Sequence, residues 1–323
     1  MNDDVYGIKK WGNDILEILE NGNIGLKNPF HPDNSPADLI KIIKSLNERG
    51  ISCPVLLRVT DYLAFRIKQI NNSFFRAIRE IRYKGEYKGV FPVKVNQQAQ
   101  VIDRIVEFGK EFDFGLEVGS KPELLIALAH DLSANSTIIC NGIKDREFIH
   151  LAILSIKIGF KTILVLESPR ELDLIIKISK ELNVLPLLGI RVKLTNKVSG
   201  NWSQSSGDRS AFGLSVEQVM EVINKLKIYD YLDCLILQHS HLGSQIPDII
   251  EIRKATQEAC RFFSEMSKLG APLTYLDLGG GLGVDYTGEQ KSAFNSINYS
   301  LDEYCTNIVA VSYTHLRAHE TDR

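Results

Sequence analysis

TILVLESPRELDLIIKISKEL, residues 162–182, contains in one stretch the unit from which the fold of this chain is built. Its beginning, Thr162 to Leu166, is a short apolar run rich in β-branched residues, which is typical of a buried strand. Its end, Pro169 to Leu182, repeats apolar residues at helical spacing, with Ser168 as the capping residue and Pro169 in the first helical position. The stretch therefore predicts a strand that leads directly into a helix.

The same unit recurs on both sides of this stretch, from about residue 88 to residue 310. We expect strands at residues 89–94, 112–116, 137–140, 162–166, 187–192, 234–238 and 274–278, and helices over 99–108, 121–129, 146–158, 169–182, 216–226 and 249–269. Repeated units of this kind form a parallel sheet covered by helices. Seven of them in one direction favour a (β/α)8 TIM barrel over an open doubly wound sheet, although periodicity alone does not separate the two.

The ends of the chain differ from this repeat. Residues 1–87 contain strand-like pieces between turns and then a long amphipathic helix over 62–83, so we expect an accessory segment that leads into the barrel of residues 88–310. Residues 195–210 are rich in Ser, Asn and Gly and predict a long loop at one rim. After a helix over 298–310, residues 311–323 are polar and aperiodic and supply no eighth strand. We interpret them as a foreign tail on a truncated barrel.

The composition favours small-molecule chemistry in the cytoplasm. A net charge of −2 provides no broad basic field for nucleic acid or for an anionic membrane. The N-terminus lacks the features of a signal peptide, and no apolar run approaches the ~18 residues of a membrane span. The five cysteines are scattered and have no CxxC spacing, so neither a disulfide framework nor a zinc site is expected.

Residues suited to chemistry lie where the predicted strands end, and barrel enzymes place their active sites at those ends. Lys94 ends the first strand, where partial desolvation would favour the neutral amine that a Schiff base requires; a lysine paired with a carboxylate is the alternative. Gly279, Gly280 and Gly281 end the seventh strand, where backbone N–H groups can approach a phosphate or simply form a tight turn. Ser244 can add a hydroxyl group to such an anion site.

Histidines and paired charges complete the set. If side chains alternate along the sixth strand, His239 and His241 face the same side of it. Three interpretations are open for them: metal ligands, for which no third ligand lies at a fixed spacing, rings that stack on a flat cofactor, or buried core histidines. Arg191 lies within an apolar strand, and Glu117 and Glu123 follow the second strand. Because an unpaired buried charge is costly, we expect this arginine to pair with these carboxylates, for structural or functional reasons.

Taken together, these pieces closely resemble the alanine-racemase-like class of pyridoxal-phosphate enzymes, and within it the biosynthetic arginine decarboxylases. The resemblance covers residues 5–310 and depends on a set of segments in a fixed order. They are YGI (6–8) with WG (11–12), PVLLR (54–58), FPVKVNQ (91–97), GLEVGSK (115–121), HSHLGSQ (239–245) and DLGGGLGVDY (277–286).

The resemblance implies that Lys94 carries pyridoxal phosphate and that His241 stacks on its ring. The residues that would hold the phosphate or lie near the ring are Ser244, Gly279, Gly280, Gly281, Arg191, Glu117 and, behind them, Glu123. It also implies decarboxylation of arginine to agmatine and carbon dioxide, for polyamine and spermidine biosynthesis, by a homodimer or a higher homo-oligomer. Mg²⁺ is a further ion that the family resemblance suggests.

The sequence departs from the family at two places, and three other interpretations of the chain are open. Ala211 stands where the family has a lysine, and the missing eighth strand and β-domain carry an acidic residue for the pyridine nitrogen, so we expect inefficient catalysis from this chain. A decarboxylase of diaminopimelate or ornithine would share these motifs. A non-catalytic paralogue that binds protein partners is another interpretation, and a metal-dependent hydrolase that uses His239 and His241 is a third.

Overall fold

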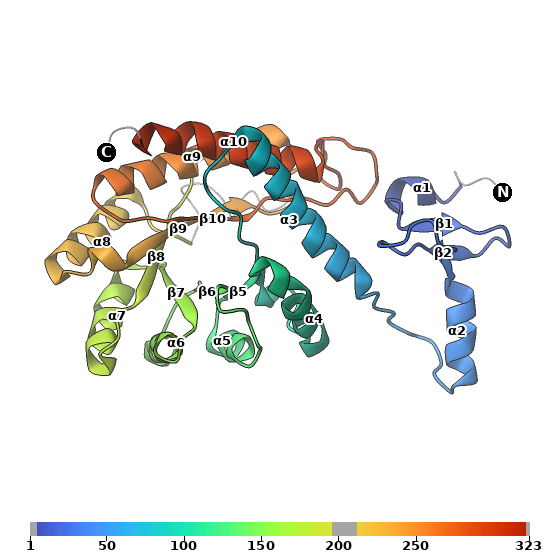
Figure 1. Ribbon diagram of the computed structural model, residues 1–323, viewed down its shortest axis with the longest axis horizontal. Coiled ribbons are helices and arrows are strands. Elements are labelled where there is room, and N and C mark those ends of the chain that lie inside the picture. The colour runs from blue at the N-terminus through green and yellow to red at the C-terminus, as the bar shows by residue number, and fades with distance from the viewer. Residues whose placement is uncertain (1–4, 196–211, 321–323) are drawn as a thin grey trace.

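In the computed structural model, which describes residues 5–195 and 212–320, parallel strands form one curved seven-stranded sheet (Figure 1). The strands are β4 (Val90–Pro92), β5 (Gly115–Val118), β6 (Thr137–Cys140), β7 (Lys161–Leu166), β8 (Leu187–Arg191), β9 (Leu235–Gly243) and β10 (Tyr275–Gly280). Each strand pairs with the next one along the chain, so the spatial order is β4 to β10 without a reversal. A doubly wound sheet would reverse its order at a switch point, and the predicted barrel arrangement is therefore confirmed.

Helices alternate with these strands and lie along the outer side of the sheet (Figure 1). They are α4 (Ala99–Gly109), α5 (Lys121–Leu128), α6 (Arg146–Lys157), α7 (Pro169–Leu182), α8 (Val216–Tyr229), α9 (Ile249–Lys268) and α10 (Leu301–Glu320). The predicted cap of α7 is confirmed, because the Ser168 hydroxyl group accepts from the backbone N–H of Arg170. Ser120 caps α5 in the same way, through the backbone N–H of Glu123.

Alternation along the strands divides the core into an outer and an inner layer. Ile138, Leu164 and Leu188 belong to the large cluster that packs against the outer helices. Ile139 and Ile163 belong to a smaller cluster on the other face, inside the curve of the sheet. Because successive side chains of a strand point to opposite faces, this register decides which polar residues face the interior.

A second core joins α3 (Asp61–Ile81) to α9 and α10. The ring of Phe74 on α3 stacks on Tyr87 with 3.9 Å between the ring centroids, and Tyr304 of α10 meets it edge-on. The predicted long helix over 62–83 is thus confirmed. It packs against α10 and α4.

Residues 5–60 form their own small layer before α3. A three-stranded antiparallel sheet of β1 (Leu16–Ile18), β2 (Ile24–Leu26) and β3 (Ala37–Asp38) lies between α1 (Ile8–Trp11) and α2 (Leu39–Glu48). Asp38 caps α2 and also accepts from the side chains of Asn21 and Asn23. These hydrogen bonds lower the pKa of this carboxyl group to about 2. No helix among the described residues is long and apolar enough to cross a membrane.

Four predicted boundaries need correction. The strand predicted at 112–116 is β5, which begins only at Gly115 because residues 110–112 form the 3₁₀ turn η2 (Lys110–Phe112). Lys94 does not end a strand but lies in the 3₁₀ turn η1 (Val93–Val95) that follows β4. Strand β9 runs to Gly243 rather than to residue 238, because its last residues pair with β10. Helix α10 does not end at residue 310 but continues to Glu320. The interpretation of residues 311–323 as aperiodic is therefore wrong as far as Glu320, since Val311 and Ser312 are buried and Tyr313 meets Tyr83 edge-on.

Two further predictions concern the eighth strand and the loop of residues 195–210. No eighth strand pairs with β4 or β10 in the part of the chain that the structure describes, as predicted. Ala211 and residues 196–210 of the predicted loop lie outside the described residues.

Candidate functional site

The carboxyl ends of the strands bring polar residues from distant parts of the sequence to the inner face of the sheet. Glu117 lies between Leu116 and Val118, which face the outer helices, so the carboxylate points inward. His239 follows Leu237 of the inner cluster by two residues and also points inward, as does Arg191 after the outward Ile190. Alternation, which the sequence already indicated, therefore assembles the site.

Lys94 and Glu117 form the first pair of this site. Nζ of Lys94 lies 3.3 Å from Oε1 of Glu117, which also accepts a hydrogen bond of 3.1 Å from the Asn141 side chain. The predicted desolvation of the Lys94 ammonium group is wrong, because its side chain is 58% exposed. The paired-lysine alternative describes this geometry better.

Two buried acceptor atoms beside Lys94 have no hydrogen-bond partner among the described residues. They are Oε2 of Glu117 and Oδ1 of Asn141, and both residues are buried. Buried polar atoms are normally hydrogen-bonded, so the two acceptors point to a donor that binds between them. Asn141 was missed by the sequence analysis, although it directly follows strand β6 and the strand-end rule could have found it.

Arg191 pairs with a residue that the sequence analysis did not name. Its Nη1 lies 2.9 Å from Oε1 of Glu167, which directly follows β7, and the predicted pairing with Glu117 or Glu123 is wrong. Glu123 instead accepts from the backbone N–H of Gly119 and from Gln97. Burial raises the pKa of Glu167, but the Arg191 guanidinium and the Gly142 N–H outweigh it, so the pKa lies below its usual value.

The two histidines have different surroundings. His239 is buried, and its Nδ1 lies 2.8 Å from Oδ2 of Asp277 on the neighbouring strand, a partner that the sequence analysis missed. Burial, aided by the neighbouring His239 and by the positive charges of Arg191 and Lys94, lowers the pKa of His241 to about 4. His241 is therefore a neutral ring at physiological pH, which suits it to stack on a flat partner.

The glycine run forms a tight contact with this histidine. Gly280 has φ +69°, and a Cβ atom there would lie 2.0 Å from the Gly243 carbonyl oxygen and 2.6 Å from Cε1 of His241. The N–H of Gly281 donates to that same carbonyl oxygen over 2.8 Å. Ser244 follows Gly243 and is exposed beside this crossing of the two strand ends.

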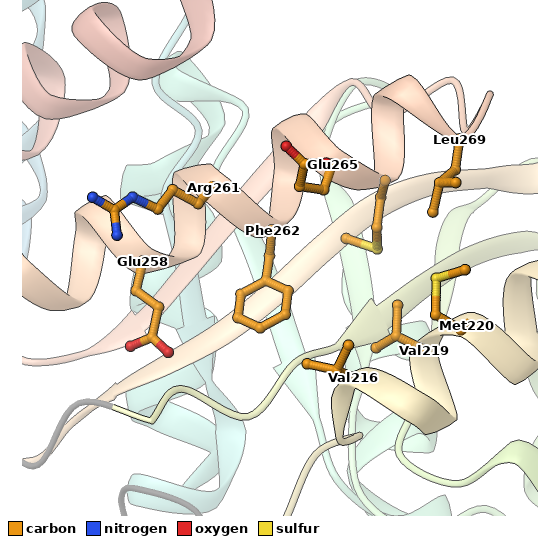
Figure 2. A pocket seen from close by; sticks show the side chains of 9 residues that line it. Val216, Val219, Met220, Glu258, Arg261, Phe262, Glu265 and Leu269 are labelled. Atoms are coloured by element: carbon orange, nitrogen blue, oxygen red, sulfur yellow. The ribbon is translucent and has the colours of Figure 1, made fainter.

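Two other kinds of ligand site, a metal site and an apolar pocket, do not involve the strand-end residues described above. The part of the chain that the structure describes holds no group of three His, Cys, Asp or Glu residues that could bind a metal ion. An apolar pocket of about 250 Å³ lies between α8 and α9. Figure 2 shows that Phe262 of α9 faces Val216 and Val219 of α8 across it. None of the strand-end residues lines this pocket, so it is separate from the candidate site.

The strand-end residues fit pyridoxal phosphate. An amine with access to solvent, a neutral imidazole and a glycine cradle lie on the same face, with the unpartnered Glu117 and Asn141 acceptors next to the amine. An aldehyde, an aromatic ring, a phosphate and a hydroxyl group are the corresponding parts of that cofactor.

Comparisons with known proteins agree with this fit. A family model described as the pyridoxal-binding domain of pyridoxal-dependent decarboxylases matches residues 67–317. Biosynthetic arginine decarboxylase from Prochlorococcus marinus (strain MIT 9312) is 46% identical over 305 residues, which are 94% of this chain and 47% of that protein. The enzyme of the same name from Nostoc sp. is 44% identical over 95% of this chain and 45% of its own length. The chain thus spans about half the length of the curated relatives that it matches.

Solved structures resemble the fold. The crystal structure of the biosynthetic arginine decarboxylase from Campylobacter jejuni superimposes with a TM-score of 0.86 at 34% identity, over 99% of this chain and 51% of that one. Diaminopimelate decarboxylase from M. jannaschii gives a TM-score of 0.72 at 21% identity, over 94% of this chain and 64% of that one, which indicates a shared fold alone. The predicted alanine-racemase-like barrel, present here with seven strands, is confirmed.

Proposed function

This chain belongs to the pyridoxal-dependent decarboxylases through their pyridoxal-binding domain, and from this premise we propose that it forms the cofactor-binding part of an arginine decarboxylase. The proposed reaction converts arginine to agmatine and carbon dioxide, as one step of polyamine biosynthesis. The observation that carries the proposal is the Lys94–Glu117 pair beside two unpartnered buried acceptors, on the same face as His241 and the glycine run.

Each residue of the site has a proposed task. Lys94 binds the cofactor covalently through its amine, and Glu117, 3.3 Å away, holds that amine in place. His241 presents a neutral ring for stacking. The bound cofactor supplies a conjugated ring that accepts the electron pair left behind by carbon dioxide.

The phosphate-binding and charge-bearing residues complete the assignment. Ser244 and the backbone at Gly279, Gly280 and Gly281 would hold the phosphate, although the Gly281 N–H is already bonded to Gly243 in this structure. Arg191 places its guanidinium near the ring. Glu123 acts behind the ring by fixing the Gly119 backbone, where its Oε2 accepts over 2.7 Å.

Arginine as the substrate is supported by the relatives, since those cited at 44–46% identity are called biosynthetic arginine decarboxylases. We further propose a cytoplasmic homodimer or higher homo-oligomer, without a nucleic-acid or membrane partner. The low net charge of −2 supports the latter part.

The domain division stays part of this proposal. Residues 1–87 would be an accessory segment, residues 88–310 the incomplete barrel, and residues 311–323 a foreign tail. The polar composition of that tail supports the last assignment, whereas the continuation of α10 to Glu320 gives its first turns a packing role.

Carbon dioxide release tests the proposed function. We would compare arginine, ornithine and diaminopimelate as substrates of the 323-residue chain and of residues 1–310 joined to the remaining half of the Prochlorococcus relative. The joined protein should release carbon dioxide from arginine faster than from the other two. A matched control is the joined protein with Lys94→Ala. Faster release from ornithine or diaminopimelate would overturn the assigned substrate, and activity of the Lys94→Ala control would overturn the assigned site.

A further inference from the structure

A pair of buried charges lies behind the candidate site and has no role in the assignments above. The side chain of Lys144 is fully buried, and that of Glu171 is only 5% exposed. Nζ of Lys144 lies 3.3 Å from Oε2 of Glu171. A buried ion pair is often no more stabilising than apolar side chains of the same volume, so stability alone does not account for it.

Glu171 connects two loops at the carboxyl ends of neighbouring strands. Its Oε1 accepts from the backbone N–H of Lys144 over 2.9 Å, in the loop after β6. Its Oε2 accepts from the backbone N–H of Glu167 over 3.0 Å, directly after β7. One carboxylate therefore holds both the backbone that follows β6 and the backbone that follows β7.

Gly142 joins this pair to Glu167. Its carbonyl oxygen accepts from Nζ of Lys144 over 2.6 Å, and its N–H donates to Oε1 of Glu167 over 2.8 Å. Gly142 has φ +75°, and a Cβ atom there would lie 2.6 Å from the Gly119 carbonyl oxygen. The loop can adopt this conformation only with glycine at this position.

The same oxygen of Glu167 receives Arg191. Nη1 of Arg191 lies 2.9 Å from it, and the guanidinium carbon lies 5.1 Å from the centroid of the Phe212 ring. The positive charge of Arg191 is among the groups that lower the pKa of His241. A continuous chain of contacts therefore leads from Lys144 and Glu171, through Gly142 and Glu167, to Arg191. Arg191 pairs in register with His239, two residues before His241 on β9.

We propose that Lys144 and Glu171 are positioning residues, which hold the Glu167 carboxylate so that the Arg191 guanidinium stays fixed on β8, next to the strand that carries His241. The inference rests on the proposed function, because it assigns these residues to the binding of pyridoxal phosphate. Neither residue touches the cofactor directly in this assignment. Their effect passes through the orientation of Arg191.

The test removes both charges together in the variant Lys144→Met/Glu171→Gln. Removing one partner alone would leave an uncompensated buried charge, whereas the double change leaves none, and the introduced amide retains one acceptor for the backbone. The matched control is Lys121→Met/Glu147→Gln, which removes an exposed pair of the same types, 2.6 Å apart, outside the chain of contacts. Thermal unfolding is recorded for each variant.

The main readout is the dissociation constant of pyridoxal phosphate, measured by cofactor absorbance on the 323-residue chain. We expect Lys144→Met/Glu171→Gln to raise this dissociation constant about tenfold or more, because replacing the residues that orient a binding group weakens binding on this scale. The control should leave the dissociation constant unchanged. In a Glu167→Gln background the same double change should add little, because its effect passes through Glu167. Additive effects in that background would overturn the proposal.

The second readout is the titration of His241, followed by nuclear magnetic resonance on the chain without cofactor. The charged or titratable groups around this ring are His239 on its own strand, Arg191 on β8, Lys94 on η1 and Asp277 on β10. If Arg191 moves away, the pKa of His241 should rise from about 4. A purely structural role of the buried pair would lower the unfolding temperature and leave both readouts unchanged, which would overturn the proposal.

Two further outcomes are distinguished. If the double variant does not fold, Glu171→Asp, which keeps the charge on a shorter side chain, carries the test, and unchanged cofactor binding in that variant overturns the proposal. If the starting chain itself does not bind pyridoxal phosphate, the proposed function fails. If it binds and the double variant binds equally well, only the positioning role fails.

Discussion

Gly280 lies directly against the imidazole ring of His241, so that a Cβ atom on this glycine would be 2.6 Å from Cε1 of the histidine. The contact joins the ends of β9 and β10, which carry the candidate ring-stacking and phosphate-binding residues. Gly280→Ala should therefore displace His241 and weaken the binding of pyridoxal phosphate, in addition to straining a backbone with φ +69°.

A glycine elsewhere in the chain separates these two effects. Gly50 has φ +80° and open space around its Cβ position, so Gly50→Ala should cost only the conformational strain of about 1–2 kcal/mol. Gly280→Ala should cost about 1–3 kcal/mol more, because the new methyl group also overlaps its neighbours. Urea unfolding and cofactor titration of both variants measure the difference. Equal stability losses, with cofactor binding intact in both, would contradict the role of this contact.

Lys94 should be the residue that carries the cofactor covalently. Borohydride reduction of the chain with pyridoxal phosphate, followed by peptide mapping, should label Lys94, because its exposed amine lies at the carboxyl end of β4 beside Glu117. Lys94→Ala should lose the label. Lys121→Ala should keep it, since that side chain pairs with Asp145 and Glu147 away from the site. A label that persists in Lys94→Ala would show that another lysine is used.

The two histidines should fail in different ways when they are replaced. His241→Ala should weaken cofactor binding strongly, because it removes the neutral ring from the inner face. His239→Ala should mainly destabilise the fold, by about 1–3 kcal/mol, because Asp277 loses its partner. Cofactor titration and urea unfolding of both variants test this assignment. Equal losses of cofactor affinity, or zinc bound in stoichiometric amount, would favour the metal-site interpretation instead.

The extent of successful prediction follows from the physics of each feature. The strands and helices of residues 88–310 could be predicted because buried apolar runs and caps such as Ser168 are local signals. The side-chain partners that lie on neighbouring strands could not be predicted. Glu167 and Asp277 were missed because their pairing with Arg191 and His239 depends on sheet register, which the sequence does not display. The exposure of Lys94 was also hidden, since it depends on how the sheet edge is covered.

Stability should depend on pH through His241. Its pKa is about 4 in the folded chain, against the ordinary value of 6.5, so the unfolded chain binds a proton more readily between these values. The folded state is therefore favoured fully above pH 6.5 and loses stability as the pH falls toward 4. This single group should cost about 2 kcal/mol between about pH 7.5 and about pH 5.

The variant His241→Asn isolates this contribution from the carboxylates that titrate in the same range. Urea unfolding at the same two pH values should give a smaller loss in this variant than in the starting chain, by about 2 kcal/mol. Cofactor is left out of both measurements, so that binding does not contribute. An identical pH dependence in the two proteins would mean that the ring of His241 is more hydrated than its surroundings indicate.

The open sheet should make the 323-residue chain associate. Strands β4 and β10 are its two edges, and each leaves a row of backbone groups without a strand partner in the described part of the chain. Such edges pair with other chains when nothing covers them, and Pro92 blocks only one donor on β4. Light scattering at micromolar concentration should therefore detect association beyond the monomer.

Removal of residues 317–323 should leave this association unchanged, because none of the described residues from Val311 to Glu320 pairs with either edge. Residues 1–310 joined to the remaining half of the Prochlorococcus relative should instead form one discrete oligomer. A monomeric, cooperatively folded 323-residue chain would contradict the argument, and loss of association on removing 317–323 would place its cause in that segment rather than at the edges.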